Sequence, residues 1–163
     1  MLEIYVIVQK KKSLMMKFLM IFSFVIGAFF LYASLLGLLL YFALAVLFVA
    51  LGWFLKNRSM EYEYSYFDGD FRFAKIINKQ KRKELTGYVA DNVTLIAPKG
   101  DRSLHQYESN PQTKRRDLSS GNKNAKIYVM VVNAEAGYQL TYFEPDEAYL
   151  DAVCVKYRQK VVR

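Results

Sequence analysis

The sequence has a single cysteine, Cys154, and no charged side chain between residues 18 and 55. One cysteine excludes an intramolecular disulfide and a metal site built from several cysteines. The sequence has no phosphate-binding loop of the P-loop type, no dinucleotide-binding fingerprint and no zinc-protease helix. The absence of charge in the apolar run argues against a transporter, a channel or a proton relay, because these need polar groups at depth. We therefore expect no catalytic residues, no cofactor and no metal.

The uncharged run itself predicts a membrane hairpin. A single helix from residue 18 to residue 55 would be about 57 Å long, whereas the hydrocarbon core of a bilayer is about 30 Å thick. Two helices fit instead, roughly Lys17–Ser34 and Leu36–Leu55, with the turn near Tyr32, Ala33, Ser34 and Gly37. The run is too long for a signal peptide. We expect three segments: 1–16 (a strand and a basic juxtamembrane stretch), 17–55 (the transmembrane hairpin) and 56–163 (a β-rich domain with a C-terminal helix).

Basic residues flank the run on both sides, and the chain has a formal net charge of +8. Lys10, Lys11, Lys12 and Lys17 come before or at the start of the run, and Lys56 and Arg58 follow it. The positive-inside rule favours cytoplasmic placement of both groups, which only an even number of passes allows. We expect both termini to be cytoplasmic.

The rest of the sequence predicts a sheet that is followed by one helix. Residues 60–67 alternate tyrosine with glutamate or serine, which is typical of a half-exposed strand, and Asp68-Gly69-Asp70 is a hairpin turn signal. Further strands are expected at 71–77, 83–89, 92–97, 127–133 and 138–143, and residues 100–124 are expected to form a long loop. Pro145 and the acids around it favour a helix start. This amphipathic helix would bury Cys154 in its apolar stripe.

The first eight residues are rich in β-branched and aromatic side chains and predict another strand. If both termini are cytoplasmic, this strand can add to the sheet of the C-terminal domain. The alternative is a short interfacial segment.

About five or six antiparallel strands closed by one helix give an α+β domain: an antiparallel bent sheet, or partial barrel, capped by the C-terminal helix. This order resembles the pleckstrin-homology-like superfamily. The segments EYEYSYFDGDFRFAKIINKQKRKEL, NVTLIAP, DLSSGN and YQLTYFEPDEAYLDAV, together with the N-terminal EIYV, are similar to a family of small two-pass bacterial membrane proteins. The resemblance covers nearly the whole chain. The resemblance implies a two-pass hairpin with a cytoplasmic domain, located in the bacterial cytoplasmic membrane. It identifies no catalytic residues in this sequence.

The candidate functional site is a basic cluster. It consists of Lys75, Lys79, Lys81, Arg82 and Lys83, joined by Lys114, Arg115 and Arg116. Such residues attract anionic lipid headgroups, at about 1 kcal/mol for each basic side chain near the surface. The alternative is a solvated hairpin that merely obeys the positive-inside rule.

Other sites have less support. Nucleic-acid binding would need basic residues among exposed aromatics, whereas Tyr62, Tyr64 and Tyr66 alternate with Glu61, Glu63 and Ser65 and are expected in the core. His105 and Cys154 could form a nucleophile–base pair on paper, but we expect Cys154 to be a buried, inert thiol of the last helix and His105 to lie in a polar loop.

We therefore expect a non-enzymatic, membrane-anchored interaction module that contacts the bilayer and a protein partner, with no nucleic acid or small-molecule substrate. The alternative is an accessory subunit of a larger membrane complex, recognised through its transmembrane hairpin.

Overall fold

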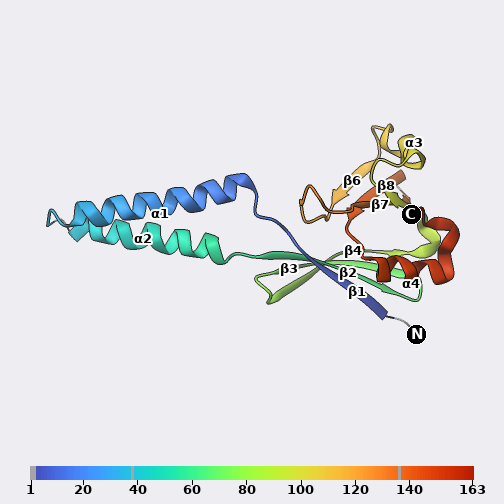
Figure 1. The fold of residues 1–163 in the computed structure, drawn as a ribbon, viewed down its shortest axis with the longest axis horizontal. Helices are drawn as coiled ribbons and strands as arrows, with labels where there is room; N and C mark the ends of the chain where they lie inside the picture. Colours follow the sequence, from blue (N-terminus) through green and yellow to red (C-terminus); the bar gives the residue numbers. More distant parts are fainter. Residues whose placement is uncertain (1–2, 38, 136) are drawn as a thin grey trace. The chain divides into compact units, whose positions relative to one another are not determined.

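The computed structural model describes residues 3–37, 39–135 and 137–163. The chain divides into two compact units (Figure 1). One unit is helical and covers residues 11–59, and the other is the sheet domain, which combines residues 1–10 with residues 60–163. The sheet domain is therefore discontinuous in sequence, because the helical unit is inserted after its first strand.

The helical unit consists of two apolar helices, α1 (Leu14–Ser34) and α2 (Leu39–Asn57). They have 21 and 19 residues, and at about 1.5 Å per residue each is about as long as a bilayer core is thick, ~30 Å. Both helices are long and apolar enough to cross a membrane. Helix α1 begins three residues before the expected Lys17, because the Ser13 side chain accepts a hydrogen bond from the Met16 amide at 3.2 Å and caps the helix there.

Small residues bring the two helices together. A Cβ added at Gly27 would lie 2.8 Å from Cγ2 of Val49, and one at Gly52 would lie 3.1 Å from the Phe24 ring. Between the helices, Gly37 has a φ of 87°, a backbone conformation that glycine adopts without strain. Helix α2 accordingly starts at Leu39 rather than at the expected Leu36. At the other end of α2, the Lys12 ammonium donates to the carbonyl oxygens of Leu55 and Lys56, which are free acceptors at a helix C-terminus.

Sheet A contains four antiparallel strands in chain order: β1 (Glu3–Gln9), β2 (Met60–Phe67), β3 (Asp70–Ile77) and β4 (Lys81–Val89). Strand β1 pairs with β2 along its whole length, which confirms that the N-terminal segment joins this sheet. The chain leaves the sheet at Lys10 and returns at Met60, and the Lys10 amide donates to the Met60 carbonyl oxygen at 2.8 Å. We call the end of sheet A that carries Lys10 and Met60 its tether end.

Sheet B contains four strands in the order β5, β7, β8, β6. Their bounds are β5 (Val93–Pro98), β6 (Lys114–Asp117), β7 (Tyr128–Ala134) and β8 (Gly137–Phe143). Strand β6 runs parallel to β8, so the expectation of a purely antiparallel sheet is wrong at this edge. The region expected as one long loop holds β6, the short helix α3 (His105–Glu108) and a 3₁₀ turn, η2 (Arg102–Leu104). Two other 3₁₀ turns are η1 (Ala90–Asn92) and η3 (Arg158–Lys160).

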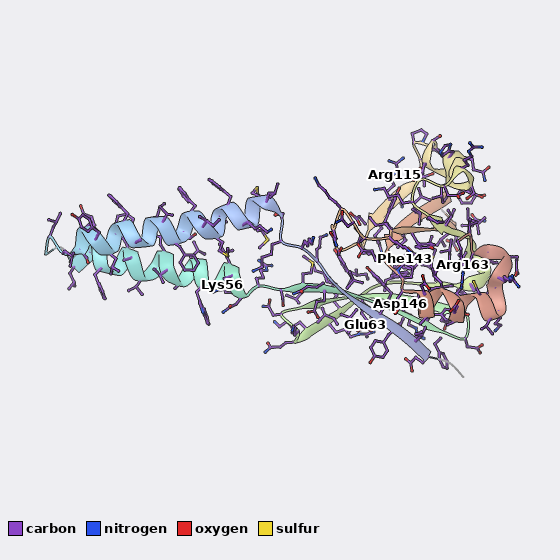
Figure 2. The ribbon with its side chains drawn as sticks, viewed as in Figure 1. Lys56, Glu63, Arg115, Phe143, Asp146 and Arg163 are labelled. Atoms are coloured by element: carbon purple, nitrogen blue, oxygen red, sulfur yellow. The ribbon has the colours of Figure 1, made fainter. Side chains whose placement is uncertain are left out.

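An aromatic core fills the space between the sheets and the closing helix α4 (Glu147–Tyr157). Tyr62, Tyr64 and Tyr66 are 6%, 0% and 4% exposed, which confirms that they pack inside. Phe143 packs edge-on against Tyr64 at 5.6 Å between ring centroids, and Figure 2 shows it inside the domain. Asp146 caps α4 by accepting from the Tyr149 amide at 2.7 Å.

A second, smaller core lies on the other face of sheet B. Leu104, Val129, Val131 and Leu140 are fully buried there, and the η2 and α3 segment provides Leu104. The helix prediction was wrong about Cys154, which is only partly buried. Arg163 donates to its Sγ at 3.9 Å.

Candidate functional site

The register of sheet A collects lysines on one face at the tether end. Residues directly opposite each other in antiparallel strands point to the same face. One row of neighbours consists of Val8, Tyr62, Lys75 and Lys83. The next row consists of Lys10, Met60, Ile77 and Lys81. We call the face formed by Lys10, Lys75, Lys81 and Lys83 the basic face. It continues the tyrosine-bearing side of the sheet.

The basic face carries uncompensated charge. Lys75 and Lys83 are direct cross-strand neighbours, and like charges in such a pair are destabilising. In the part of the chain that the structure describes, none of the four lysines of this face forms an ion pair with a carboxylate. A bound anion would therefore reduce the electrostatic repulsion between Lys75 and Lys83.

The β3–β4 turn adds one more cation to this end of the sheet. Ile77 pairs with Met60 at the tether end, so the turn that follows Ile77 lies at that end too. Asn78 and Lys79 have positive φ angles of 53° and 58°, and the Gln80 amide donates to the Ile77 carbonyl oxygen at 3.2 Å. Two residues with positive φ are typical of a tight hairpin turn. The Lys79 side chain is exposed at its tip.

Lys10 belongs to the basic face but was not among the residues predicted from the sequence. Its Nζ donates to the Tyr62 hydroxyl at 3.1 Å and lies 5.1 Å from the centre of the Tyr62 ring. The two groups are far apart in sequence, so only the pairing of β1 with β2 shows the contact. The alternation of β1, which places Ile4, Val6 and Val8 against the core, could have assigned Lys10 to the same face.

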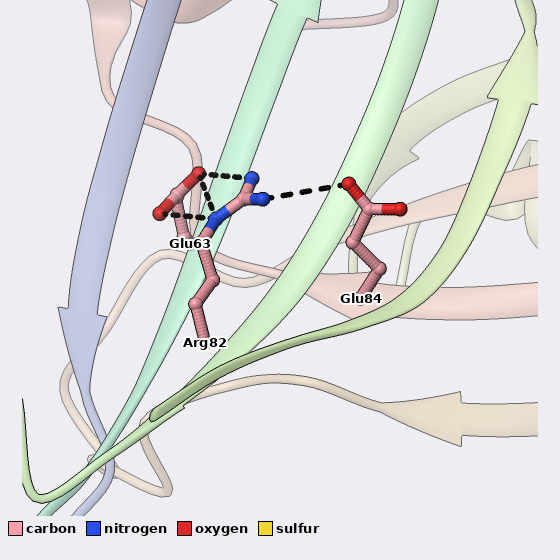
Figure 3. A network of polar contacts seen from close by, with 3 residues as sticks. All are labelled: Glu63, Arg82 and Glu84. Atoms are coloured by element: carbon pink, nitrogen blue, oxygen red, sulfur yellow. Dashed lines mark hydrogen bonds and ion pairs between the residues drawn. The ribbon is translucent and has the colours of Figure 1, made fainter. Parts of the chain in front are cut away.

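Arg82 belongs to the opposite face of the sheet and is already neutralised. Its guanidinium donates to both carboxylate oxygens of Glu63, with the shortest contact at 2.7 Å, and to Glu84 at 3.4 Å (Figure 3). The hydrogen bonds to Glu63 raise the pKa of Arg82. The structure therefore separates Arg82 from its sequence neighbours Lys81 and Lys83, because successive residues of a strand point to opposite faces.

The other predicted basic residues, Lys114, Arg115 and Arg116, form strand β6 of sheet B. The Arg115 side chain donates to the Glu108 carbonyl oxygen at 2.6 Å, and that of Arg116 to the Leu85 carbonyl oxygen at 3.2 Å. Lys114 is exposed. These three residues do not belong to either row of the basic face.

The described residues include no group of three or more metal-ligating side chains. His105 lies exposed on α3, whereas Cys154 lies on α4 near Arg163. Burial raises the pKa of Tyr64 and that of Tyr149, so both phenols stay neutral at physiological pH. The chemistry that the arrangement offers is cationic contact through the basic face.

A model of a family described as a bacterial PH-like domain, DUF6106, matches residues 2–163. The chain belongs to this family. The two apolar helices, the sheet domain and the closing helix α4 agree with a PH-like fold on a membrane-associated protein, which confirms the fold class expected from the sequence. Comparison with curated proteins and with solved structures finds no match. The PH-like domain of this chain includes β1, which precedes the two helices.

Proposed function

We propose that this protein is a non-enzymatic membrane-anchored module. Its two helices cross the bacterial cytoplasmic membrane, and its PH-like domain contacts anionic headgroups on the cytoplasmic side through the basic face and Lys79. The domain would present its other surfaces to a protein partner. The observation that carries the proposal is that these lysines share the tether end of sheet A and that none of them has a carboxylate partner among the described residues.

The pairing of β1 with β2 supports two passes. The two strands flank the helices in sequence and share backbone hydrogen bonds. A sheet cannot form across a bilayer, because both of its strands must be on the same side. This pairing supports an even number of crossings, and the lysines on both sides of the apolar run favour the cytoplasm for both ends.

The chain connections support contact with the headgroups. Only Arg58 and Ser59 separate the last residue of α2 from Met60, the first residue of β2. An extended chain spans at most about 3.6 Å per residue. The tether end is therefore joined by only two residues to the helix that we propose crosses the membrane. Each lysine there contributes about 1 kcal/mol of attraction to an anionic surface.

Hydrogen–deuterium exchange of the full chain in lipid nanodiscs tests this contact. We expect phosphatidylglycerol to slow amide exchange in residues 77–81, relative to phosphatidylcholine alone. Replacement of Lys79 by Asn and of Lys81 and Lys83 by Ala should abolish this lipid effect. Asparagine is chosen at position 79 because it tolerates a positive φ.

The matched control removes the same charge elsewhere. Lys114, Lys123 and Lys126 are exposed lysines on β6 and in the loop that follows it, and their replacement by Ala should leave the lipid effect unchanged. Two results would refute headgroup contact through this face. In one, amide exchange of residues 77–81 in the unmodified protein is the same with both lipids. In the other, the two triple variants lose the lipid effect equally.

Protease digestion of sealed inverted and right-side-out vesicles tests the proposed topology. Both the segment before Ser13 and the PH-like domain should be cut only in inverted vesicles. Cleavage of the domain in right-side-out vesicles would place it outside and overturn the proposal.

A further inference from the structure

Strand β1 is an edge of sheet A, with β2 on one side and no described strand on the other. Its sequence, EIYVIVQ, has no proline and no lysine, and such residues are what usually protects an edge from pairing. Tyr5 and Ile7 are 66% and 50% exposed. The other edge of the sheet, β4, is different, because it begins with three basic residues and Arg116 donates to its Leu85 carbonyl oxygen.

The hydrogen bonds of β1 show which backbone groups are free. The Lys10 amide bonds to Met60, and in an antiparallel pair the bonded residues alternate along each strand. Ile4, Val6 and Val8 therefore direct their backbone groups toward β2. Glu3, Tyr5, Ile7 and Gln9 direct theirs toward the open edge.

We propose that β1 pairs with β1 of a second copy of this chain, antiparallel and centred on Val6. This register puts Glu3 opposite Gln9 of the partner subunit, where the amide can donate to the carboxylate. It puts Tyr5 opposite the partner's Ile7, an aromatic–β-branched pair of the kind that stabilises sheets. All seven residues find a compatible neighbour, and the two sheets join into one sheet with two-fold symmetry.

The register also matches the free backbone groups. The pairs Glu3–Gln9 and Tyr5–Ile7 join residues whose amides and carbonyls face the open edge, so each pair can exchange hydrogen bonds across the two-fold axis. A shift of one residue would oppose side chains from different faces of the sheet. Two copies held in one membrane have a high effective concentration, which favours a contact of this limited size.

Disulfide crosslinking of the full chain in native membranes tests the register. In the centred register Val6 faces the partner's Val6 at a non-hydrogen-bonded position, where Cα atoms lie about 4.5 Å apart, which is within the range that a disulfide spans, ~4.4–6.8 Å. A V6C variant with Cys154→Ala should give a covalent dimer on mild oxidation. V89C in the same background is the control, since Val89 is exposed on the opposite edge strand.

A charge exchange separates the proposed dimer from any effect within one chain. Gln9→Glu, added to V6C, puts two glutamates opposite each other at both ends of the pair and should lower the crosslinked fraction severalfold. Adding Glu3→Lys should restore it. Within one chain residues 3 and 9 are about 20 Å apart along the strand, so this rescue can occur only between copies.

Two outcomes would overturn the proposal: V6C crosslinking no more than V89C, or Gln9→Glu losing crosslinking without rescue by Glu3→Lys. A dimer captured through another surface would give the first result. Neither outcome bears on headgroup contact, because the lysines of the basic face and Lys79 stay in place in all these variants.

Discussion

At the scale of single residues, the tyrosine hydroxyls of the aromatic core differ in whether they have a partner. The Tyr64 hydroxyl donates to the Leu118 carbonyl oxygen at 2.6 Å. The Tyr149 hydroxyl is fully buried and has no hydrogen-bond partner among the described residues. A buried polar group without a partner costs about 1–3 kcal/mol. The core therefore contains one stabilising hydroxyl and one destabilising hydroxyl within the same cluster.

Tyr149→Phe should stabilise the domain by about 1 kcal/mol, since it removes an unpaired polar atom and keeps the ring. Tyr64→Phe should destabilise it by about 1–2 kcal/mol, because the Leu118 carbonyl then loses its donor. Both changes in stability can be measured by thermal unfolding of the full chain in detergent, with near-ultraviolet circular dichroism of the tyrosines as the signal. Destabilisation by Tyr149→Phe would mean that the hydroxyl has a partner, such as a buried water.

At the scale of elements, the helical unit depends on close packing of α1 and α2. Gly27 and Ala45 are buried between them, and the Phe30 ring stacks on Tyr41 and on Phe48. Small residues matter more in a membrane than in water, because apolar side chains gain little by leaving lipid for another helix. Close contact of backbone and side chains then supplies most of the attraction.

Gly27→Val should loosen the hairpin, because its Cβ alone would lie 2.8 Å from Cγ2 of Val49. The expected result is a fall of several degrees in the temperature at which the full chain aggregates in detergent. Ala28→Val is the matched control, since Ala28 is exposed on the neighbouring position of the same helix. If both variants aggregate at the same temperature, the close approach at Gly27 does not stabilise the hairpin.

At the scale of the whole molecule, the PH-like domain is complete only when residues from both sides of the helices combine. Lys10 directly follows the last residue of β1 and Met60 begins β2, and the Lys10 amide donates to the Met60 carbonyl oxygen at 2.8 Å. Two antiparallel strands whose ends form such a hydrogen-bonded pair can be joined by a two-residue hairpin turn. The helical unit therefore occupies the place of a β-turn in the sheet.

Replacement of residues 11–59 by Asn-Gly should give a water-soluble, folded domain with β1 and β2 joined directly. Residues 60–163 alone should aggregate, because they lack β1 and leave β2 as an unprotected edge. Size-exclusion chromatography and thermal unfolding distinguish the two proteins. Equal solubility and cooperativity would show that β1 is dispensable for the fold.

The sequence alone determined the features that depend on local periodicity and length. The uncharged run is too long for one helix, and the alternation at 60–67 and the Asp68-Gly69-Asp70 turn define a hairpin that the structure confirms. The start of α4 also followed from local chemistry at Pro145 and Asp146. These signals are local, so neighbours in sequence are enough to produce them.

Only the tertiary structure decided which distant residues meet. Strand register placed Lys75, Lys81 and Lys83 on the same face of sheet A as Lys10 and moved Arg82 to the opposite face, where Glu63 neutralises it. It also placed Leu104, from a polar segment, in a second core and set β6 parallel to β8. Such pairings depend on long-range hydrogen bonds and burial, and no window of sequence contains both partners. The basic face at the tether end is therefore a product of the fold.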